Sequence, residues 1–483
     1  MGDGNEVDNL LSAQRTIDEL RQLVAQQTRV IEAQARRMER LEGEIAALKG
    51  KLEEALRAGK RQAGPFSRNK PKADPQKPGQ KPGHEPANRA VPNKSEIKRV
   101  VKARLPLGCE CGGHIFETEQ QPQYQFDLPR PIPIMVTQFD VSIGYCEACG
   151  KRHQGRHPEQ TSDALGAAGV QIGPNVLAMT AELKHAYGMS YGAITKFLKG
   201  MSGLTVERSA LVRGDERLAN KLMPTYNQLI LRLREKQVVY GDETGWRVGG
   251  KPAWLWAFDS DDITVYEIDP TRKHEVIERI LTAKFKGVLK SDCFVAYDDE
   301  DLAGIQKSKC LGHLIRRSRD IELVKSGRAV QFSKRVTQLL RAAIRLKACM
   351  SQMTQHGYAV ARGRLEAALD RLLAGNYSDK DNARLARLLL KQRHALFNFL
   401  DIPGCDATNN AAERAIRPAV IIRKTNGCNR TDRGKSTHKI IASVLRTCAK
   451  QGRNFGDYAA ALLRVRQMAV LSIAMPRAKA APA

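Results

Sequence analysis

The segment that begins at residue 237 constrains the fold most, because short apolar stretches follow one another there in a fixed order. The stretches KQVVYGDET, PAWLWAFDS and DITVYEID are rich in β-branched and aromatic residues, which is typical of strands. TRKHEVIERILTAKF has the apolar periodicity of an amphipathic helix, GVLKSD is a fourth strand, and SKCLGH is a fifth. The sequence therefore predicts an α/β domain in which Asp242 lies near the end of the first strand and Asp292 at the end of the fourth.

This order of strands, with helices before and after the fourth, is that of a ribonuclease-H-like fold. In that fold the first and fourth strands are neighbours, so the two aspartates come together. A third carboxylate follows a run of amphipathic helices over residues 325–402, in the stretch GCDATNNAAERAIRP. Thr408, Asn409 and Asn410 are candidate N-caps. Glu413 is then expected in the first turn of a helix, where the helix dipole favours its ionised form.

Three carboxylates are the smallest set that holds two divalent cations with one carboxylate bridging them. Hard oxygen ligands suit Mg²⁺ or Mn²⁺. Two such ions about 3.5–4 Å apart stabilise the attacking and leaving oxygens of an in-line displacement at phosphorus. Asp242, Asp292 and Glu413 are the predicted catalytic and metal-binding set.

Other acids of the same segment are given structural roles. Glu243 directly follows Asp242 and is expected on the opposite face of the strand, because side chains alternate along a strand. Asp298 and Asp299 lie past the fourth strand and are expected to be solvated loop acids. A single aspartate at a strand end is more often a cap or a turn residue than a metal ligand, so the prediction depends on the ordered set.

The whole chain is strongly basic. Its 483 residues include 79 Lys and Arg against 52 Asp and Glu, a formal charge of +27. This excess favours a polyanionic partner such as DNA. The sequence has no run of about 18 apolar residues, so it predicts no membrane span. The acidic start MGDGNEVDNLL is unlike a secretory signal, and ten cysteines are too few for a disulfide scaffold. We expect a cytoplasmic, nucleoid-associated protein with no membrane partner.

Residues 10–58 repeat apolar side chains every seven positions. One seam holds Ile17, Val24, Ile31, Met38, Ile45 and Leu52, and the other holds Leu20, Leu41, Leu48 and Ala55. This pattern predicts a coiled coil that pairs protomers in a homodimer or higher oligomer; the alternative is a single amphipathic helix packed on its own chain. Residues 59–96 are rich in Pro, Gly and Lys and predict a basic linker, which either follows phosphates or is simply solvated.

Residues 97–157 alternate like strands and carry two cysteine pairs. Cys109 and Cys111 form the first pair, and Cys146 and Cys149 form a Cys-x-x-Cys-Gly motif. The four thiolates predict a structural Zn²⁺ site on a zinc-ribbon-like β domain, although the first pair is one residue shorter than usual. Four free buried cysteines are the alternative.

Residues 161–236 are expected to be helical. The stretch MSYGAITKFLKGMSGLTVERSALVRGDERLA has the order helix, glycine turn, helix, with Arg208, Arg213 and Arg217 on the second helix. The pattern is typical of a helix-turn-helix DNA-binding region and equally of an ordinary helical hairpin.

A second basic region surrounds the third carboxylate. Residues 413–453 contain eleven Lys or Arg and two acids. We expect the DNA backbone to lie along this region, and the first basic residues after Glu413 are the candidate contacts: Arg414, Arg417, Arg423 and Lys424. A solvated basic face is the alternative.

Several motifs together resemble the DDE-class transposases of the insertion sequence 66 family. They are YGDETGWRV, KSDCFVAYD, CLGHLIRR, NNAAERAIRPAVIIRKTNG and SVLRTCAKQGRNFGDYA, with the linker motif PGQKPGHE and the cysteine pairs. The resemblance implies a ribonuclease-H-like core in two parts, residues 237–324 and 403–460, separated by a helical insertion at 325–402 and followed by a tail at 461–483.

The same resemblance implies the triad Asp242, Asp292 and Glu413. His313 in the Cys-x-x-His motif matches a family position beside the active site, where it contacts or positions the scissile phosphate together with Arg316 and Arg317. The sequence departs from the family at Leu311, where Trp is frequent, and at Thr425, which interrupts an Arg-Lys-Asn run.

The implied function is that of a transposase. It binds the terminal inverted repeats of an insertion sequence and catalyses metal-dependent cleavage and strand transfer of double-stranded DNA, with small accessory proteins of the element as further partners. Two alternatives remain at this stage. A metal-dependent nuclease of the same fold would cut without joining strands, and a dimeric DNA-binding regulator would not need the triad.

Overall fold

The computed structural model describes residues 18, 20–45, 48, 91–101, 110, 118–126, 129 and 131–465. The chain divides into two units, residues 1–124 and 125–483, and each is described by itself. Across these described ranges, every helix is too short or too polar to cross a lipid bilayer.

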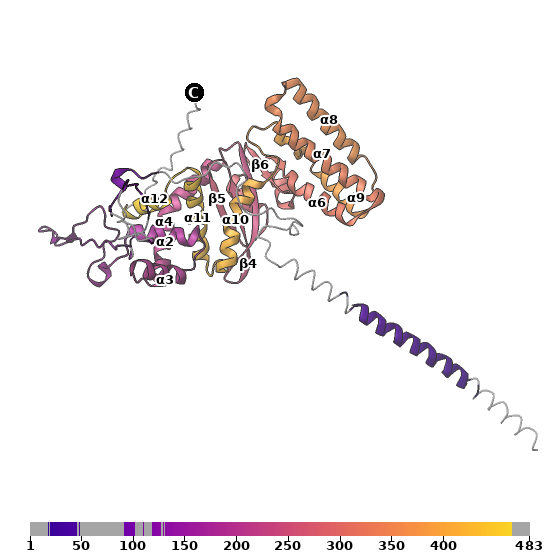
Figure 1. Cartoon of the computed structure of the whole chain (residues 1–483), viewed down its shortest axis with the longest axis horizontal. Helices are drawn as coiled ribbons and strands as arrows, with labels where there is room; N and C mark the ends of the chain where they lie inside the picture. The colour runs from indigo at the N-terminus through magenta and orange to yellow at the C-terminus, as the bar shows by residue number, and fades with distance from the viewer. Residues whose placement is uncertain are drawn as a thin grey trace, which may run out of the picture. The chain divides into compact units, whose positions relative to one another are not determined.

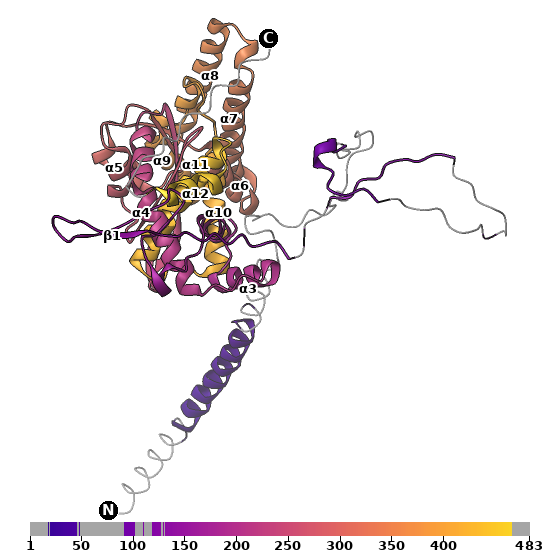
Figure 2. The ribbon, with the colours of Figure 1, turned by 90° about the vertical axis from the view of Figure 1, so that its left-hand side faces the viewer.

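The first unit contains a helix over residues 20–45 (Figure 2). The apolar side chains of both predicted seams are exposed on it; those of Val24, Ile31 and Met38 are each more than 60% exposed, at 63%, 62% and 62%. An apolar stripe of this kind is what a coiled-coil helix presents to its partner. Pairing itself stays a prediction, and both ends of the predicted segment, with linker residues 59–90, lie outside the described residues.

The second unit is built on a five-stranded sheet. Its strand order is β5-β4-β3-β6-β7, with β3, β4 and β5 antiparallel and with β6 and β7 parallel to β3. The strands are β3 (Val238–Val248), β4 (Lys251–Asp259), β5 (Thr264–Asp269), β6 (Val288–Ser291) and β7 (Gln306–Lys309). Helix α5 (Glu275–Leu281) joins β5 to β6, as expected. The helix expected between β6 and β7 is replaced by two short 3-10 helices, η3 (Val295–Asp298) and η4 (Glu300–Leu302).

The register between β3 and β6 places the two predicted aspartates. Tyr240 lies opposite Lys290 in this parallel pair. Asp242 and Asp292 each follow two residues later, so both are carried to the same level of the sheet. The adjacency expected from the strand order is therefore observed between β3 and β6.

Helices cover both faces of the sheet (Figure 1). On the face that carries Val239, Trp256 and Leu289, a large apolar core includes helices α2 (Pro174–His185), α4 (Arg208–Leu233), α5, α11 (Asp432–Lys450) and α12 (Phe455–Arg464). On the other face, α10 (Asn410–Asn426) packs against Trp246 and Leu255.

The outer edge of β5 is covered by α11. The backbone N–H of Tyr266 donates to Ser443 Oγ at 2.8 Å, and the N–H of Thr264 donates to Thr447 Oγ1 at 3.2 Å. These hydroxyls satisfy backbone groups that an exposed edge strand would leave unpaired.

A separate apolar core holds the helices that follow β7. These helices stand together beyond β6 in Figure 1 and are α6 (Leu311–Val324), α7 (Gln331–Ala348), α8 (Gln355–Leu373) and α9 (Lys380–Lys391), with the short 3-10 helices η5 (Gly327–Val330), η6 (Met350–Gln352), η7 (Arg393–Ala395) and η8 (Asn398–Leu400). They lie between Asp292 and Glu413 in the sequence and pack over the β7 side of the sheet.

The part of the second unit before α2 has little regular structure. Its two strands, β1 (Ile143–Tyr145) and β2 (Arg152–Gln154), form an antiparallel hairpin. The strands expected over residues 124–142 do not form among the described residues, because these extended segments have no ladder partner. Helix α3 (Tyr191–Ser202) ends at Gly203, whose positive φ of 76° completes the predicted glycine turn before α4.

Candidate active site

Asp242 lies on β3, on the sheet face that α10 covers. Its Oδ1 accepts a hydrogen bond from the backbone N–H of Glu243 at 3.0 Å. Burial is the main cause that raises the pKa of Asp242 to about 8; the nearby carboxylates of Glu243 and Asp292 contribute to this rise, and the Glu243 N–H and His313 oppose it. Desolvation and like charges disfavour an ionised carboxylate. The Asp242 carboxylate therefore lies in a place where a cation would be strongly favoured.

Asp292 directly follows β6, and hydrogen bonds hold both its side chain and its backbone. Its Oδ1 accepts from the backbone N–H of Phe294 at 2.9 Å. Its carbonyl oxygen accepts from the Ser291 hydroxyl at 2.9 Å and from Lys309 Nζ at 3.2 Å. The side chain is thus fixed by the turn that it begins.

Glu413 lies in the first turn of α10, as the sequence predicts. Asn409 occupies the N-cap position, but its side chain does not cap the helix. It donates through Nδ2 to the Gly241 carbonyl at 2.8 Å instead, which ties the start of α10 to the strand residue before Asp242. The Glu413 side chain is 40% exposed, and its Oε1 lies 3.7 Å from His313 Nε2.

His313 lies between the carboxylates. A hydrogen bond with Cys310 is the main cause that raises the pKa of His313, burial opposes it, and the charges of Cys310, Asp292 and Glu413 add to the rise. The Cys310 thiol also accepts from the Asn409 backbone N–H at 3.1 Å. His313 thus faces two of the three predicted metal ligands, and it also lowers the pKa of Asp242.

The three predicted carboxylates do not form one tight cluster. Within the described residues, the group of His, Cys, Asp and Glu ligand atoms that all lie within 4.8 Å of one another is His274, Asp299 and Asp301. A pair of ions about 3.5–4 Å apart needs a wider spacing, because its outer carboxylates bind different ions. The donors at Asp242, Asp292 and Glu413 are hard oxygens on neighbouring elements, which is the ligand type that Mg²⁺ and Mn²⁺ prefer.

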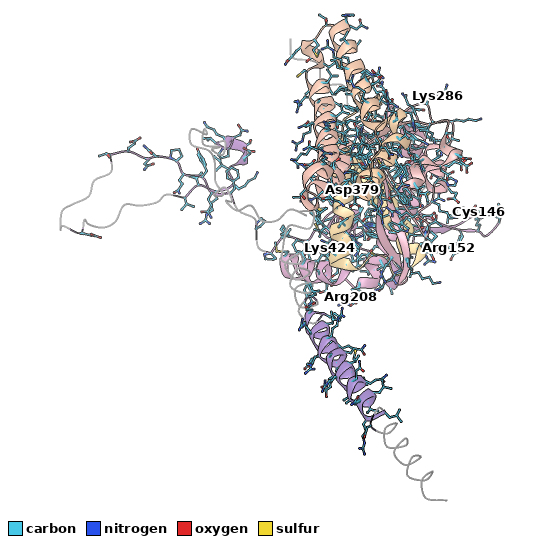
Figure 3. All side chains as sticks on the ribbon, turned by 90° about the vertical axis from the view of Figure 1, so that its right-hand side faces the viewer. Cys146, Arg152, Arg208, Lys286, Asp379 and Lys424 are labelled. Carbon is cyan, nitrogen blue, oxygen red and sulfur yellow. The ribbon has the colours of Figure 1, made fainter. Side chains whose placement is uncertain are left out.

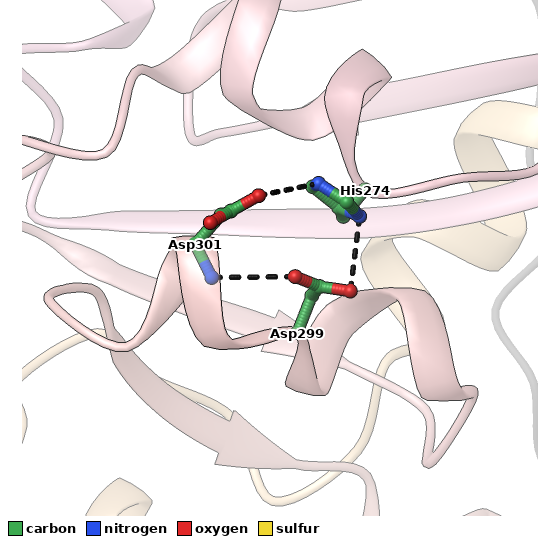
Figure 4. Close-up of side chains that lie close together, drawn as sticks. All are labelled: His274, Asp299 and Asp301. Carbon is green, nitrogen blue, oxygen red and sulfur yellow. Dashed lines mark hydrogen bonds and ion pairs between the residues drawn. The ribbon is translucent and has the colours of Figure 1, made fainter.

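The imidazole of His274 bridges the carboxylates of Asp299 and Asp301 (Figure 4). His274 Nδ1 lies 3.0 Å from Asp299 Oδ2, and His274 Nε2 lies 2.8 Å from Asp301 Oδ2. Each ring nitrogen therefore already contacts a different carboxylate. The imidazole links the segment after β5 to η4, which follows the Asp292 turn.

The expectation of solvated loop acids is wrong for Asp298, whereas the Asp299 side chain is 37% exposed. Asp298 is 8% exposed and pairs with the buried Lys309 ammonium at 2.6 Å, and Asp299 pairs with His274. The 3-10 helix η3 folds the chain back toward β7, which carries Asp298 into the interior. A run of acids after a strand gives no local signal of this turn.

Glu243 also has partners that the sequence did not indicate. Arg272 donates to Glu243 Oε1 through Nη2 at 2.6 Å and Nε at 3.0 Å, and the Tyr297 hydroxyl donates to Oε2 at 2.7 Å. Arg272 itself stacks between the rings of Trp254 and Phe294.

The predicted DNA-contacting residues fall into different environments. Arg316 and Arg317 are exposed on α6, and Lys424 is exposed near the end of α10 (Figure 3). Arg417 is also exposed on α10. Arg423 instead donates to Thr244 Oγ1 at 3.0 Å and to the Gly245 carbonyl. Its guanidinium is thus bound to β3 through one nitrogen, and its contact with DNA stays a prediction.

Arg414 lines a cavity of about 720 Å³ on the Asp242 side of the sheet. The start of β3, including Tyr240, and the helices α10 and α11 surround this cavity. Arg446 and Lys450 of α11 add positive charge to its wall. Asp259, Asp261 and Asp406 also line the cavity, so its wall carries charges of both signs.

The zinc prediction can be followed for half of its ligands. Cys109 and Cys111 lie outside the described residues. Cys146 and Cys149 lie in the turn between β1 and β2, where the Gly150 N–H donates to the Cys146 carbonyl at 2.8 Å. Hydrogen bonding to Cys149 is the main cause that lowers the pKa of Cys146. This turn is suited to thiolate ligands, and the four-cysteine site stays a prediction.

Helix α4 is the second helix of the predicted helix-turn-helix, and its inner side is buried along its length, from Leu211 to Leu233. Arg213, Arg217 and Lys221 follow one another at four-residue spacing and line a second cavity of about 740 Å³. The opposite side of α4 is open at the start of the helix, where Arg208, Val212 and Arg213 are exposed, and DNA binding by this region stays a prediction.

The family is given by comparison with known proteins. A family model described as "Transposase IS66 family" matches residues 169–437, which is more than half of the chain, and the protein belongs to this family. The chain is 26% identical over 303 residues to the uncharacterized protein y4qI of Sinorhizobium fredii (strain NBRC 101917 / NGR234), covering 55% of this chain and 56% of that protein. It is 24% identical over 281 residues to y4jD of the same strain, covering 52% and 54%. The chain thus matches about half the length of these curated relatives.

Proposed function

We propose that the protein is a transposase that binds the terminal inverted repeats of an insertion sequence and catalyses metal-dependent cleavage and strand transfer of DNA. One observation carries the proposal. Asp242 and Asp292 reach the same level on the adjacent strands β3 and β6, and His313 lies 3.7 Å from Glu413 while its charge also acts on both aspartates. Family membership supports the same activity.

The strand order supports a ribonuclease-H-like core in this proposal. Three antiparallel strands, followed by two that run parallel to the first, are the order expected for that fold. The helices between Asp292 and Glu413 then form the insertion. Asp242, Asp292 and Glu413 would hold two Mg²⁺ or Mn²⁺ ions, which activate the attacking oxygen and stabilise the leaving oxygen of a phosphodiester.

The residues of the chain have separate tasks in this reaction. The Phe294 N–H fixes the Asp292 carboxylate, and Asn409 fixes the start of α10 against Gly241. His313, with a raised pKa, donates a hydrogen bond to a phosphate oxygen at the site. The reaction needs no covalent enzyme intermediate, because water attacks first and the freed 3′-hydroxyl attacks the target strand.

DNA would reach the site along exposed basic side chains. Arg316 and Arg317 flank the site on α6, Arg417 and Lys424 lie on α10, and Arg414 lines the neighbouring cavity. Such residues contact phosphates and position the duplex. The stripe of Arg213, Arg217 and Lys221 on α4 would bind backbone phosphates of the element ends.

The N-terminal parts would assemble the complex. The exposed apolar stripe of residues 20–45 supports pairing of two protomers in a coiled coil, which would hold two DNA ends together. A structural Zn²⁺ on the Cys146 turn, completed by Cys109 and Cys111, would order the segment between the coiled coil and the core. Accessory proteins of the element are further partners, and the place of action is the nucleoid in the cytosol.

The test uses the full-length protein with DNA that flanks its own gene, in Mg²⁺ or Mn²⁺. We expect end cleavage and strand joining on a gel, both lost in Asp292→Ala and retained in Asp261→Ala, the same change at an acid with a 79% exposed side chain. Cleavage without joining would favour a nuclease. DNA binding that is unchanged in Asp292→Ala, with no cleavage by any variant even when the element's other gene products are added, would favour a regulator.

A further inference from the structure

Lys309, at the end of β7, is a fully buried cation beside the catalytic turn. Its side chain is 0% exposed. The Nζ atom pairs with Asp298 Oδ1 at 2.6 Å and donates to Ser291 Oγ at 3.3 Å and to the Asp292 carbonyl at 3.2 Å. One ammonium therefore binds both ends of the turn that runs from Asp292 to Asp298.

A buried ammonium is costly unless charged and polar groups surround it. Its partners here are a carboxylate, a hydroxyl and a main-chain carbonyl, which fix its position from three directions. Any shift of Asp298 must therefore move Lys309 or break the pair. Because Lys309 also binds the Asp292 carbonyl, the position of Asp298 is coupled to that of Asp292.

A buried side chain of the helical segment after β7 binds this turn by a hydrogen bond. Gln392, which directly follows α9, is 1% exposed, and its Nε2 donates to Asp298 Oδ2. The second oxygen of Asp298 is thus bound by the helical segment, while the first is bound by β7. Packing of α6 to α9 is thereby connected to the turn that carries Asp292.

We propose that Gln392, Asp298 and Lys309, the Lys309 network, position Asp292 for metal binding, so that the helical segment controls the geometry of the catalytic site. The inference rests on the proposed function, because it takes Asp292 as a metal ligand. The three members are positioning residues and do not touch substrate.

The helical segment supplies a matched control. Asn398 also belongs to it, and its Nδ2 donates to the Lys307 carbonyl at 2.8 Å on the same strand β7. This hydrogen bond joins the same two parts of the fold but does not reach Asp298. Gln392→Met and Asn398→Leu each remove one buried amide donor at nearly constant volume, so a purely structural role predicts similar effects of the two changes.

The first measurement is amide hydrogen exchange of residues 291–298 in the metal-free full-length protein. We expect faster exchange at the Phe294 amide in Gln392→Met and no change in Asn398→Leu. The second is calorimetric Mn²⁺ binding, for which we expect about tenfold weaker affinity in Gln392→Met, the size typical of a lost contact behind a metal ligand. In cleavage assays kcat should fall about tenfold with an unchanged KM for DNA.

Exchange and Mn²⁺ affinity that are unchanged in Gln392→Met, or altered equally in both variants, would overturn the Lys309 network. Asp298→Asn is a second variant that keeps the side-chain shape but removes the charge that pairs with Lys309. It should weaken Mn²⁺ binding at least as much as Gln392→Met does. A wild-type protein that binds no Mn²⁺ and cleaves no DNA contradicts the proposed function, whereas the exchange result still decides whether the network holds the turn.

Discussion

The two faces of β3 treat neighbouring acids in opposite ways. Glu243 meets a guanidinium at 2.6 Å and a phenol hydroxyl at 2.7 Å. Asp242, one residue earlier, accepts one backbone N–H and otherwise faces carboxylates and His313. Burial raises the pKa of both side chains, but for Glu243 the contacts with Tyr297 and Arg272 oppose the rise.

The difference separates a structural acid from a candidate ligand. A carboxylate whose charge is compensated by fixed partners stabilises the fold and has few free lone pairs. A carboxylate that lacks such partners and faces other acids is destabilised until a cation arrives. Because side chains alternate along a strand, two consecutive residues of β3 can have these two different roles.

Asp242→Asn should have the largest effect of the changes considered. Loss of one metal-binding oxygen is expected to reduce metal-dependent cleavage by about a thousandfold or more, of the order seen when a group that stabilises the transition state is removed. The fold should remain, because the variant also removes repulsion from Asp292. Single-turnover cleavage and thermal unfolding without metal measure the two effects. Cleavage within tenfold of the parent would mean that Asp242 is not a ligand.

Glu243→Gln should show the reverse pattern. The amide cannot pair with Arg272 as the carboxylate does, and we expect a loss of about 2 kcal/mol in the free energy of unfolding, reduced somewhat because Arg272 is partly exposed. Cleavage per folded molecule should fall by less than about tenfold, in contrast to the loss expected for Asp242→Asn. Urea unfolding measures the stability of Glu243→Gln, and cleavage assays at equal concentrations of folded protein measure its activity. If Glu243→Gln kept its full stability but lost cleavage, Glu243 would be the candidate metal ligand and not the structural acid.

Tyr297→Phe makes a smaller change on the same face. It removes one buried hydroxyl donor to Glu243 and leaves the ring against Trp256 and Phe294. We expect about 1 kcal/mol of lost stability, the usual size for one hydrogen bond, with the Arg272 pair intact. In a double-mutant cycle with Glu243→Gln, the two losses should be less than additive. Full additivity would show that the hydroxyl and the carboxylate do not interact.

The smallest expected effect is a pH dependence of the stability, caused by a histidine on the Asp242 face of the sheet. Farther along this face, Trp246 stacks on His438, and burial holds the pKa of His438 well below its usual value, with His185 and Lys184 adding to the shift. The unfolded chain then binds more protons below about pH 6.5, so stability falls as the pH drops.

This fall should be about 1 kcal/mol between pH 7.5 and pH 6, and His438→Phe should lessen it. Urea unfolding at the two pH values measures it. The groups that face His438 include His185 at 2.9 Å, and His185 in turn contacts Asp215 at 3.2 Å. An equal slope in parent and variant would assign the pH dependence to these other groups.

Local patterns predicted the parts of the site that depend on local structure. The alternation of side chains along a strand predicted that Asp242 and Glu243 lie on opposite faces. The polar residues before α10 predicted Glu413 in the first turn of that helix. Asp298 was misjudged because its partner Lys309 is brought near only by the tertiary fold, and the hydrogen bonds of Arg423 to Thr244 and Gly245 were missed for the same reason. A charged residue carries no mark in the sequence that shows whether it will be buried against a distant partner.

The segment before α2 likewise shows that local sequence patterns do not determine which elements lie side by side. Residues 124–142 have the apolar alternation of strands, but alternation alone does not supply a neighbour to pair with. The buried inner side of α4 was likewise not visible in a pattern of helix, turn and helix. In both regions the deciding information was which other element lies alongside.

The covering of the sheet edges limits how two copies of this chain can meet. Ser443 and Thr447 occupy the backbone groups along β5, and at the opposite edge Asn398 binds the Lys307 carbonyl on β7. Part of each edge of the five-stranded sheet is therefore already hydrogen-bonded, which disfavours association of this sheet with a second one by strand addition. The assembly on DNA that we propose would then depend on other surfaces, such as the exposed apolar stripe of residues 20–45.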